Sequence, residues 1–112
     1  MKKFISFIVV FFICFCLKAQ QYKEGISIVQ FTADFVKSAE LNNFKKYNTH
    51  IFDITKDSKI FFKESVTTVP TIILFNNGNE ETRIEANILL ELPDDWEKTI
   101  NKFIEEILSQ KF

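Results

Sequence analysis

The stretch from Val66 to Gly78, VTTVPTIILFNNG, decides the fold. Pro70 has no backbone N–H, so it fits at the first residue of a sheet strand rather than inside one. The apolar run Thr71 to Phe75 follows and predicts a short buried strand. Asn77-Gly78 then supplies two residues that tolerate positive φ angles, which favours a type I′ turn. The stretch therefore predicts a buried strand and an antiparallel strand after it.

The rest of the chain alternates between strand and helix patterns. The predicted order is strand, helix, strand, helix, strand, strand, helix, which implies an α/β domain with a mixed sheet and helices on both faces. The last helix is the clearest, because its apolar residues recur at helical spacing on one stripe. The expected strands are Ile26 to Phe31, Thr49 to Ile54, Thr71 to Phe75 and Glu81 to Ala86. The first expected helix is Asp34 to Tyr47, and the second is a short one capped by Asp57 that carries Ile60, Phe61 and Phe62. The third has Pro93 in its first positions, and the residues on its apolar stripe are Trp96, Ile100, Phe103, Ile104, Ile107 and Leu108.

The first residues have the pattern of a bacterial export signal. Lys2 and Lys3 precede an apolar run from Phe4 to Leu17, and small Ala19 stands at the end. This run is shorter than the ~20 residues of a bilayer span. We therefore expect a signal peptide over 1–19, cut near Ala19 or Gln20, and one domain over 20–112 in the periplasm or the secreted fraction. An uncleaved anchor is the alternative; after cleavage no stable membrane span is expected.

Both cysteines, Cys14 and Cys16, lie in the apolar run of this signal. Ile13 and Phe15 precede them where a lipoprotein signal has a small residue, which disfavours lipidation. Cleavage would leave no thiol for disulfides, catalysis or metal binding. It would also remove Lys18 and the two other signal lysines, so that 14 basic residues fall to 11 against 15 acidic ones, a net charge of −4. Such a chain has no basic stripe for nucleic acid.

Several short motifs resemble those of the thioredoxin-like superfamily. Phe31-Thr32-Ala33-Asp34-Phe35 resembles the Phe-Trp-Ala-x-Trp that leads into its active site. Val66-x-x-Val69-Pro70-Thr71 resembles its cis-proline loop, Asn77-Gly78 its hairpin turn, and Ala86 stands where the family has a glycine. The resemblance covers Ile26 to about Leu108. It implies a three-layer thioredoxin-like fold and a cis peptide bond before Pro70.

The active-site residues of that family are replaced. Its Cys-x-x-Cys corresponds to Val36-Lys37-Ser38-Ala39, and thiol–disulfide exchange needs both cysteines. The family's buried aspartate and its lysine on the neighbouring strand correspond to Gln30 and Ile51. The chain therefore resembles a redox-inactive member, and we expect no catalytic residues, cofactor or metal.

The remaining polar candidates do not form a catalytic set. Ser38 lacks a base and is expected to cap a helix. His50, the single histidine, has no other ligands clustered with it for a metal. Asp34 and Asp53 are expected at a helix start and a strand end.

The resemblance instead implies a binding surface. In the family, the residue before the cis proline pairs its backbone with an extended peptide, and here that residue is Val69. The expected function is non-catalytic binding of a polypeptide partner, in an adaptor or chaperone-like role. An enzyme with thiol-independent chemistry is the main alternative. The candidate peptide-binding residues are Phe35, Val36, Thr68, Val69 and Pro70.

The segment Ile88 to Leu92, ILLEL, is more apolar than a solvated loop requires. We expect it to pack along the sheet as an extra strand. The alternative is an interface with a partner or a second copy through Ile88, Leu89, Leu90 and Leu92, which would give a homodimer.

Overall fold

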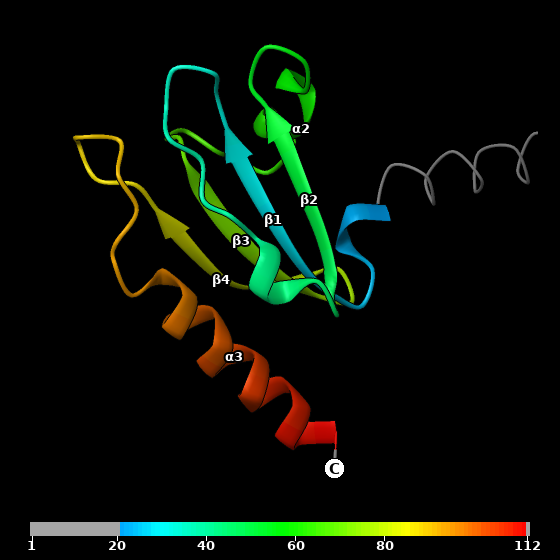
Figure 1. Cartoon of the computed structure of the whole chain (residues 1–112). Coiled ribbons are helices and arrows are strands. Elements are labelled where there is room, and N and C mark those ends of the chain that lie inside the picture. The colour runs from blue at the N-terminus through cyan, green and yellow to red at the C-terminus, as the bar shows by residue number, and fades with distance from the viewer. Residues whose placement is uncertain (1–20, 112) are drawn as a thin grey trace, which may run out of the picture.

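The computed structural model describes residues 21–111 and builds them around a four-stranded sheet (Figure 1). The strands lie in the order β2-β1-β3-β4. β1 pairs with β2 in parallel, whereas β3 is antiparallel to both β1 and β4. The sheet is mixed, as the sequence predicts. The strands are β1 (Ile26–Thr32), β2 (Asn48–Asp53), β3 (Thr71–Asn76) and β4 (Asn79–Glu85).

Helices cover both faces of the sheet, which explains why the central strands β1 and β3 are buried along almost their whole length. The helix α3 (Trp96–Lys111) packs on one face and the short helix α2 (Ser58–Lys63) on the other. The core on the α3 face includes Ile28, Ile72, Leu74, Ile84, Ile100, Ile104 and Ile107. The core on the α2 face includes Tyr22, Val29, Phe31, Phe61, Val69, Ile73 and Phe75.

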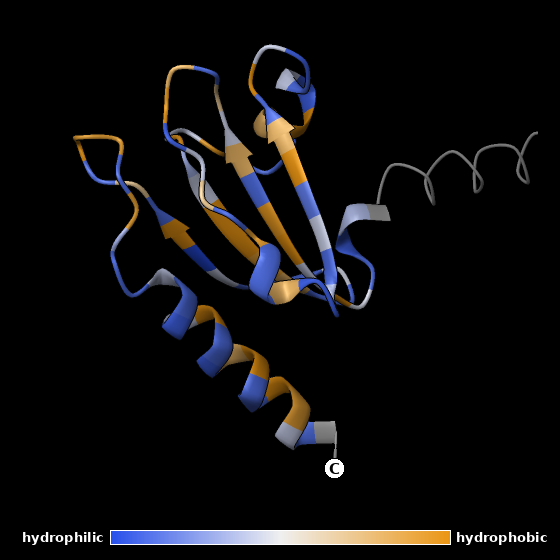
Figure 2. Ribbon diagram, in the orientation of Figure 1, coloured by the Kyte–Doolittle hydropathy of each residue, from blue (hydrophilic) through white to orange (hydrophobic). Residues whose placement is uncertain are grey.

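The predicted apolar stripe of α3 faces the sheet, and its polar side faces outward (Figure 2). One detail of the prediction is wrong, because Pro93 lies before the helix. The helix begins at Trp96, whose N–H donates to the Pro93 carbonyl at 3.2 Å. Asp94 and Asp95 form the turn between them and bring negative charge to the positive end of the helix.

The hairpin turn between β3 and β4 is confirmed. Asn77 and Gly78 have φ angles of 51° and 91°, as a type I′ turn requires. Their N–H groups donate to the carbonyls of Gly25 and Lys23, each at 2.9 Å. The turn is thereby fixed to the segment that precedes β1.

The predicted helix Asp34 to Tyr47 is wrong. This part of the chain forms a turn, an irregular stretch and a single 3₁₀ turn, η2 (Asn42–Phe44). The cause lies in β1, because Gln30 binds the backbone N–H and C=O of Ala39 that a helix would use itself. Phe35, in the turn that follows β1, is 73% exposed.

The short helix α2 begins where the sequence predicts, but Asp57 does not cap it with its side chain. Asp57 Oδ2 instead accepts the N–H of Asp53 at 3.1 Å. The aspartate thus closes the loop between β2 and the helix.

The predicted strand at Ile88 to Leu92 is also wrong. Asn87 folds the segment into a compact loop, since its Oδ1 accepts the N–H groups of Leu89 and Glu91 at 2.8 and 3.2 Å. The Asn87 N–H also donates to the Glu91 carbonyl at 2.9 Å. A backbone turned upon itself in this way cannot extend the sheet.

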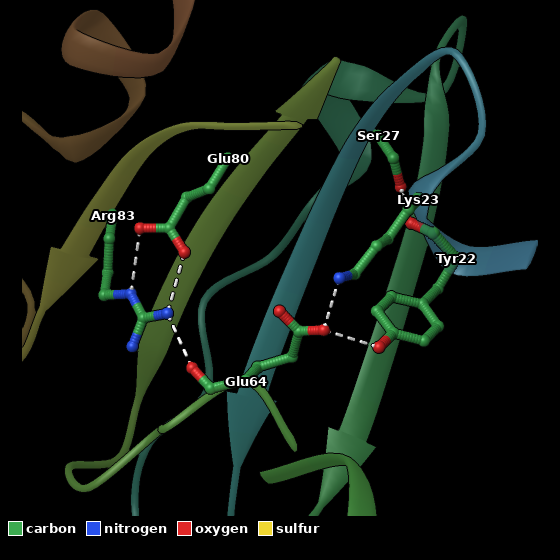
Figure 3. A network of polar contacts seen from close by, with 6 residues as sticks. All are labelled: Tyr22, Lys23, Ser27, Glu64, Glu80 and Arg83. Carbon is green, nitrogen blue, oxygen red and sulfur yellow. Dashed lines mark hydrogen bonds and ion pairs between the residues drawn. The ribbon is translucent and has the colours of Figure 1, made fainter. Parts of the chain in front are cut away.

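The described chain starts with a single 3₁₀ turn, η1 (Gln21–Lys23), that is tied into the domain by polar contacts (Figure 3). The Tyr22 hydroxyl donates to Glu64 Oε1 at 2.7 Å, and Lys23 Nζ lies 2.6 Å from the same oxygen. Arg83 on β4 donates to the Glu64 carbonyl at 2.6 Å. These contacts join the start of the domain to the end of α2 and to β4.

Within residues 21–111, no helix has both the length and the apolar character to span a bilayer. The predicted signal peptide, with Cys14 and Cys16, lies outside the described residues.

Candidate functional site

The loop after β1 is held by a fully buried glutamine. Gln30 Nε2 donates to the Ala39 carbonyl at 2.8 Å, and Gln30 Oε1 accepts the Ala39 N–H at 2.7 Å. The side-chain amide pairs with this backbone as a neighbouring strand would. In the sheet, Gln30 is paired with Ile51 of β2, the neighbour that the sequence indicates.

The four residues Val36 to Ala39 cross the end of the sheet without forming a helix. Val36 packs on the α2 face, and Ala39 packs on the α3 face. The expectation that Ser38 caps a helix is therefore wrong. Its hydroxyl lies 2.7 Å from the Thr32 hydroxyl and, within residues 21–111, contacts no base that could activate it.

The peptide bond between Val69 and Pro70 is cis. Val69 is 8% exposed as a whole residue, and its side chain packs in the same core as Val36. No hydrogen bond from residues 21–111 reaches the Val69 N–H or C=O. The neighbouring Pro70 carbonyl is occupied by the Ala86 N–H at 3.1 Å.

Thr68 and Pro70 flank Val69 in the chain, and Val36 packs in the same core. Thr68 is held by Thr71, whose hydroxyl donates to the Thr68 carbonyl at 2.8 Å. Val36 contributes to the core beneath, and Phe35 extends from the same turn into solvent. The exposed Phe35 is therefore linked to Val69 through Val36, which follows Phe35 in the chain and shares a core with Val69.

Two titratable groups near this end of the sheet, His50 and Asp53, have shifted pKa values. His50 stacks on Phe52 at 6.2 Å, and burial lowers the pKa of its imidazole below the ordinary value. The pKa of Asp53 is also lowered, chiefly by the hydrogen bond from the Thr55 hydroxyl. Asp53 ends its strand as expected, while Asp34 lies in a turn. Among residues 21–111, no three His, Cys, Asp or Glu side chains gather to hold a metal.

No protein-family model matches the sequence, and no curated protein matches it. Solved structures do match the fold. The thioredoxin of Trypanosoma brucei brucei superposes with a TM-score of 0.60 at 15% identity, over 81% of this chain and 82% of that one. The thioredoxin of Malassezia sympodialis gives 0.58 at 16% identity, over 75% and 81%. A thioredoxin pre-protein of Schistosoma mansoni gives 0.55 at 22% identity, over 75% and 84%.

The chain has a thioredoxin-like fold. This result confirms the fold class expected from the motifs around Pro70 and Asn77-Gly78. The identities are too low to carry an activity across from these thioredoxins. What this thioredoxin-like domain does must therefore be argued from its own residues.

Sequence reasoning treated Gln30 only as a replaced aspartate and missed its structural role. One signal was available, because Gln30 is the only amide side chain in the buried strand ISIVQFT. A buried amide needs hydrogen-bond partners, and the following loop is the nearest backbone that can supply them. The sequence does not reveal that Ala39 would be the residue bound.

Proposed function

We propose that this protein is exported and binds an extended segment of a partner polypeptide without reacting with it. Two observations support the proposal. No hydrogen bond from residues 21–111 reaches the Val69 N–H or C=O, and the exposed Phe35 directly precedes Val36, which packs in the same core as Val69. A strand of the partner would pair with the Val69 N–H and C=O, and one of its apolar side chains would cover Phe35. The role is that of an adaptor or chaperone-like binder.

Absence of thiol chemistry is part of this proposal. The sequence has cysteines at 14 and 16 only, within the predicted signal, and Val36 and Ala39 have no nucleophile. Gln30 cannot exchange a proton as a carboxylate would, and both ends of its amide are already engaged by Ala39. These features support binding over catalysis.

Export is supported by the first residues and by how the domain begins. A cut near Ala19 or Gln20 would leave Tyr22 and Lys23 in the mature protein, where both contact Glu64 (Figure 3). The mature domain would thus keep its N-terminal anchor. We place the protein in the bacterial periplasm or the secreted fraction.

A matched pair of exposed phenylalanines tests the binding surface. Peptides are selected on the wild-type protein from a random display library, and one synthetic winner is titrated into wild type, Phe35→Ser and Phe62→Ser. Phe62 lies on α2 and is 89% exposed, so it controls for loss of an exposed ring. We expect Phe35→Ser to weaken binding at least about fivefold, or about 1 kcal/mol, and Phe62→Ser to leave it unchanged. Equal effects of the two changes would contradict the proposal.

Self-association is a second candidate, favoured by the exposed loop after β4. Ile88 is 97% exposed and Leu89 71%, although Leu92 packs against the core on the α3 face. Large apolar side chains exposed on a compact loop are typical of contact surfaces. A homodimer through Ile88, Leu89 and Leu90 would bury them.

A further inference from the structure

A groove of about 490 Å³ lies between the irregular loop after β1 and the start of α3. One wall is Lys37 to Ala39, and Gln30 binds the backbone of Ala39 at the end of this wall. The opposite wall is Leu90 to Asp94, whose first part is shaped by Asn87. The opening therefore exists because neither wall adopts the helix or strand that its sequence pattern favours.

The floor of this groove is apolar and fixed in place. Ala39, Leu92 and Trp96 line it, and all three also pack against the core on the α3 face. The Trp96 ring lies 5.9 Å from the ring of Phe44, which is fully buried. Trp96 is half-buried, so part of its indole remains open to a ligand. Such a floor suits one apolar or cationic side chain.

The rim of the groove carries more negative than positive charge. Glu91 and Asp94 are exposed, and neither forms an ion pair with any residue of the described part of the chain. Lys37 is the one basic residue among those that line the groove. Carboxylates without partners beside an apolar floor are complementary to a lysine or arginine next to an apolar side chain.

We infer that this groove binds a basic and apolar segment of a partner polypeptide, with its cation at Glu91 and Asp94 and its apolar side chain on Leu92 and Trp96. The inference goes beyond the proposed function. Ala39, Leu92 and Trp96 pack on the α3 face, whereas Val36 and Val69 pack on the α2 face. Binding in the groove thus does not require pairing with the Val69 backbone.

Trp96 reports on the groove directly, since it is the only tryptophan of the chain. The protein is expressed from its complete sequence and purified in the form that the host accumulates. Its tryptophan emission is followed while a peptide of sequence Gly-Lys-Leu-Lys-Gly is added, and then a peptide with glutamate in place of both lysines. We expect a saturable change with the basic peptide, weakened by added salt, and binding of the acidic peptide at least about tenfold weaker.

Two charge reversals locate the effect. Glu91→Lys changes the rim, and Glu81→Lys makes the same change on β4, where Glu81 is exposed and lies outside the groove. We expect Glu91→Lys to weaken binding of the basic peptide at least about fivefold and Glu81→Lys to leave it unchanged. If Glu91→Lys does not fold by circular dichroism, Glu91→Gln takes its place, with a smaller loss expected.

Four results would overturn the inference. The first is an unchanged Trp96 emission with the basic peptide. The second is equal binding of the acidic peptide, and the third is equal binding of the basic peptide by the Glu91 variant. The fourth is a change of emission with protein concentration alone, which would assign the groove to a second copy of the chain. None of these results depends on Phe35 or Val69, so failure of the groove and failure of the proposed function can be told apart.

Discussion

The side chain of Gln30 and the backbone of Ala39 exchange two hydrogen bonds, with Nε2 donating at 2.8 Å and Oε1 accepting at 2.7 Å. This pair fixes the backbone of Ala39 in the loop that follows β1, and Ala39 lines the groove at Trp96. The glutamine side chain supplies both a donor and an acceptor, whereas an ionised carboxylate can only accept hydrogen bonds.

Gln30→Glu should destabilise the domain in a pH-dependent way. The ionised carboxylate can accept the Ala39 N–H but cannot donate to its carbonyl, and it is buried, so we expect a loss of about 2 kcal/mol or more at neutral pH. Burial raises the pKa of the introduced carboxyl in the folded state, so the variant loses stability as the pH rises from about 4 towards that pKa. Urea unfolding of variant and wild type at about pH 4.5 and about pH 7 measures the difference. Gln110→Glu, at an exposed position of α3, is the control. An equal loss at both pH values would contradict this role of Gln30.

Tyr22 should make stability fall at alkaline pH. Burial first, and then the hydrogen bond to Glu64, raise the pKa of its hydroxyl well above the ordinary value of 10. Above about pH 10 the unfolded chain releases this proton while the folded chain keeps it, so the free energy of unfolding decreases as pH rises. Tyr22→Phe removes the titrating group, and its stability should decline less steeply between about pH 9.5 and about pH 11. The matched control is Tyr47→Phe, and parallel curves for wild type and Tyr22→Phe would refute the prediction.

Glu64 should contribute more to stability than an exposed acidic residue. It accepts from Tyr22, pairs with Lys23 at 2.6 Å, and its side chain is only 7% exposed. Glu64→Ala would leave Lys23 without its partner and Tyr22 without its acceptor, at a cost of about 3 kcal/mol. Glu81→Ala should cost less than about 0.5 kcal/mol, because Glu81 is exposed. Thermal or urea unfolding distinguishes the two.

Restoring the two cysteines should not restore a thioredoxin-like activity. Thiolates in such sites are favoured by a helix N-terminus, and Val36 to Ala39 contains no helix. We therefore expect the double variant Val36→Cys, Ala39→Cys to reduce insulin disulfides no faster than a simple dithiol does. Wild-type protein purified after signal removal should give no reduction at all. Fast turnover by the double variant would show that the loop can become helical.

Leu89→Glu tests self-association through the loop after β4. Leu89 is exposed, so the change should alter stability by less than about 0.5 kcal/mol. If the loop forms a dimer contact, sedimentation velocity should show a concentration-dependent dimer of the wild type that the variant lacks. Ile51→Glu, at a 58% exposed position of β2, is the control. A wild type that stays monomeric at every concentration rules out this candidate.

The fold could be predicted from local signals, whereas the site could not. Pro70, the apolar run after it and Asn77-Gly78 each determine their own backbone conformation, and the structure has the cis bond, the buried strand and the positive φ angles. The helix α3 could be predicted because its apolar residues recur at helical spacing on the one face that packs on the sheet. In these places local preference and tertiary packing agree.

The wrong predictions of a helix over 34–47 and a strand over 88–92 have one cause: hydrogen bonds from a polar side chain override the local spacing of apolar residues. Gln30 redirects the backbone at Ala39, and Asn87 folds the segment around Leu89 and Glu91. The spacing of apolar residues indicates which side chains could be buried. It does not reveal which side-chain amide will form hydrogen bonds with a backbone group several residues away. The groove at Trp96 lies between the two segments that these amides bind, so the sequence pattern did not predict it.

The central claim is that the Val69 backbone pairs with an extended peptide, and its amide proton tests this most directly. Hydrogen exchange of the assigned Val69 amide is measured by NMR in the free protein and with the selected peptide at saturation. We predict fast exchange in the free protein, because no hydrogen bond from residues 21–111 reaches this group, and at least about tenfold slower exchange in the complex. An unchanged exchange rate at Val69 in a saturated complex would contradict the claim and assign the peptide to another surface.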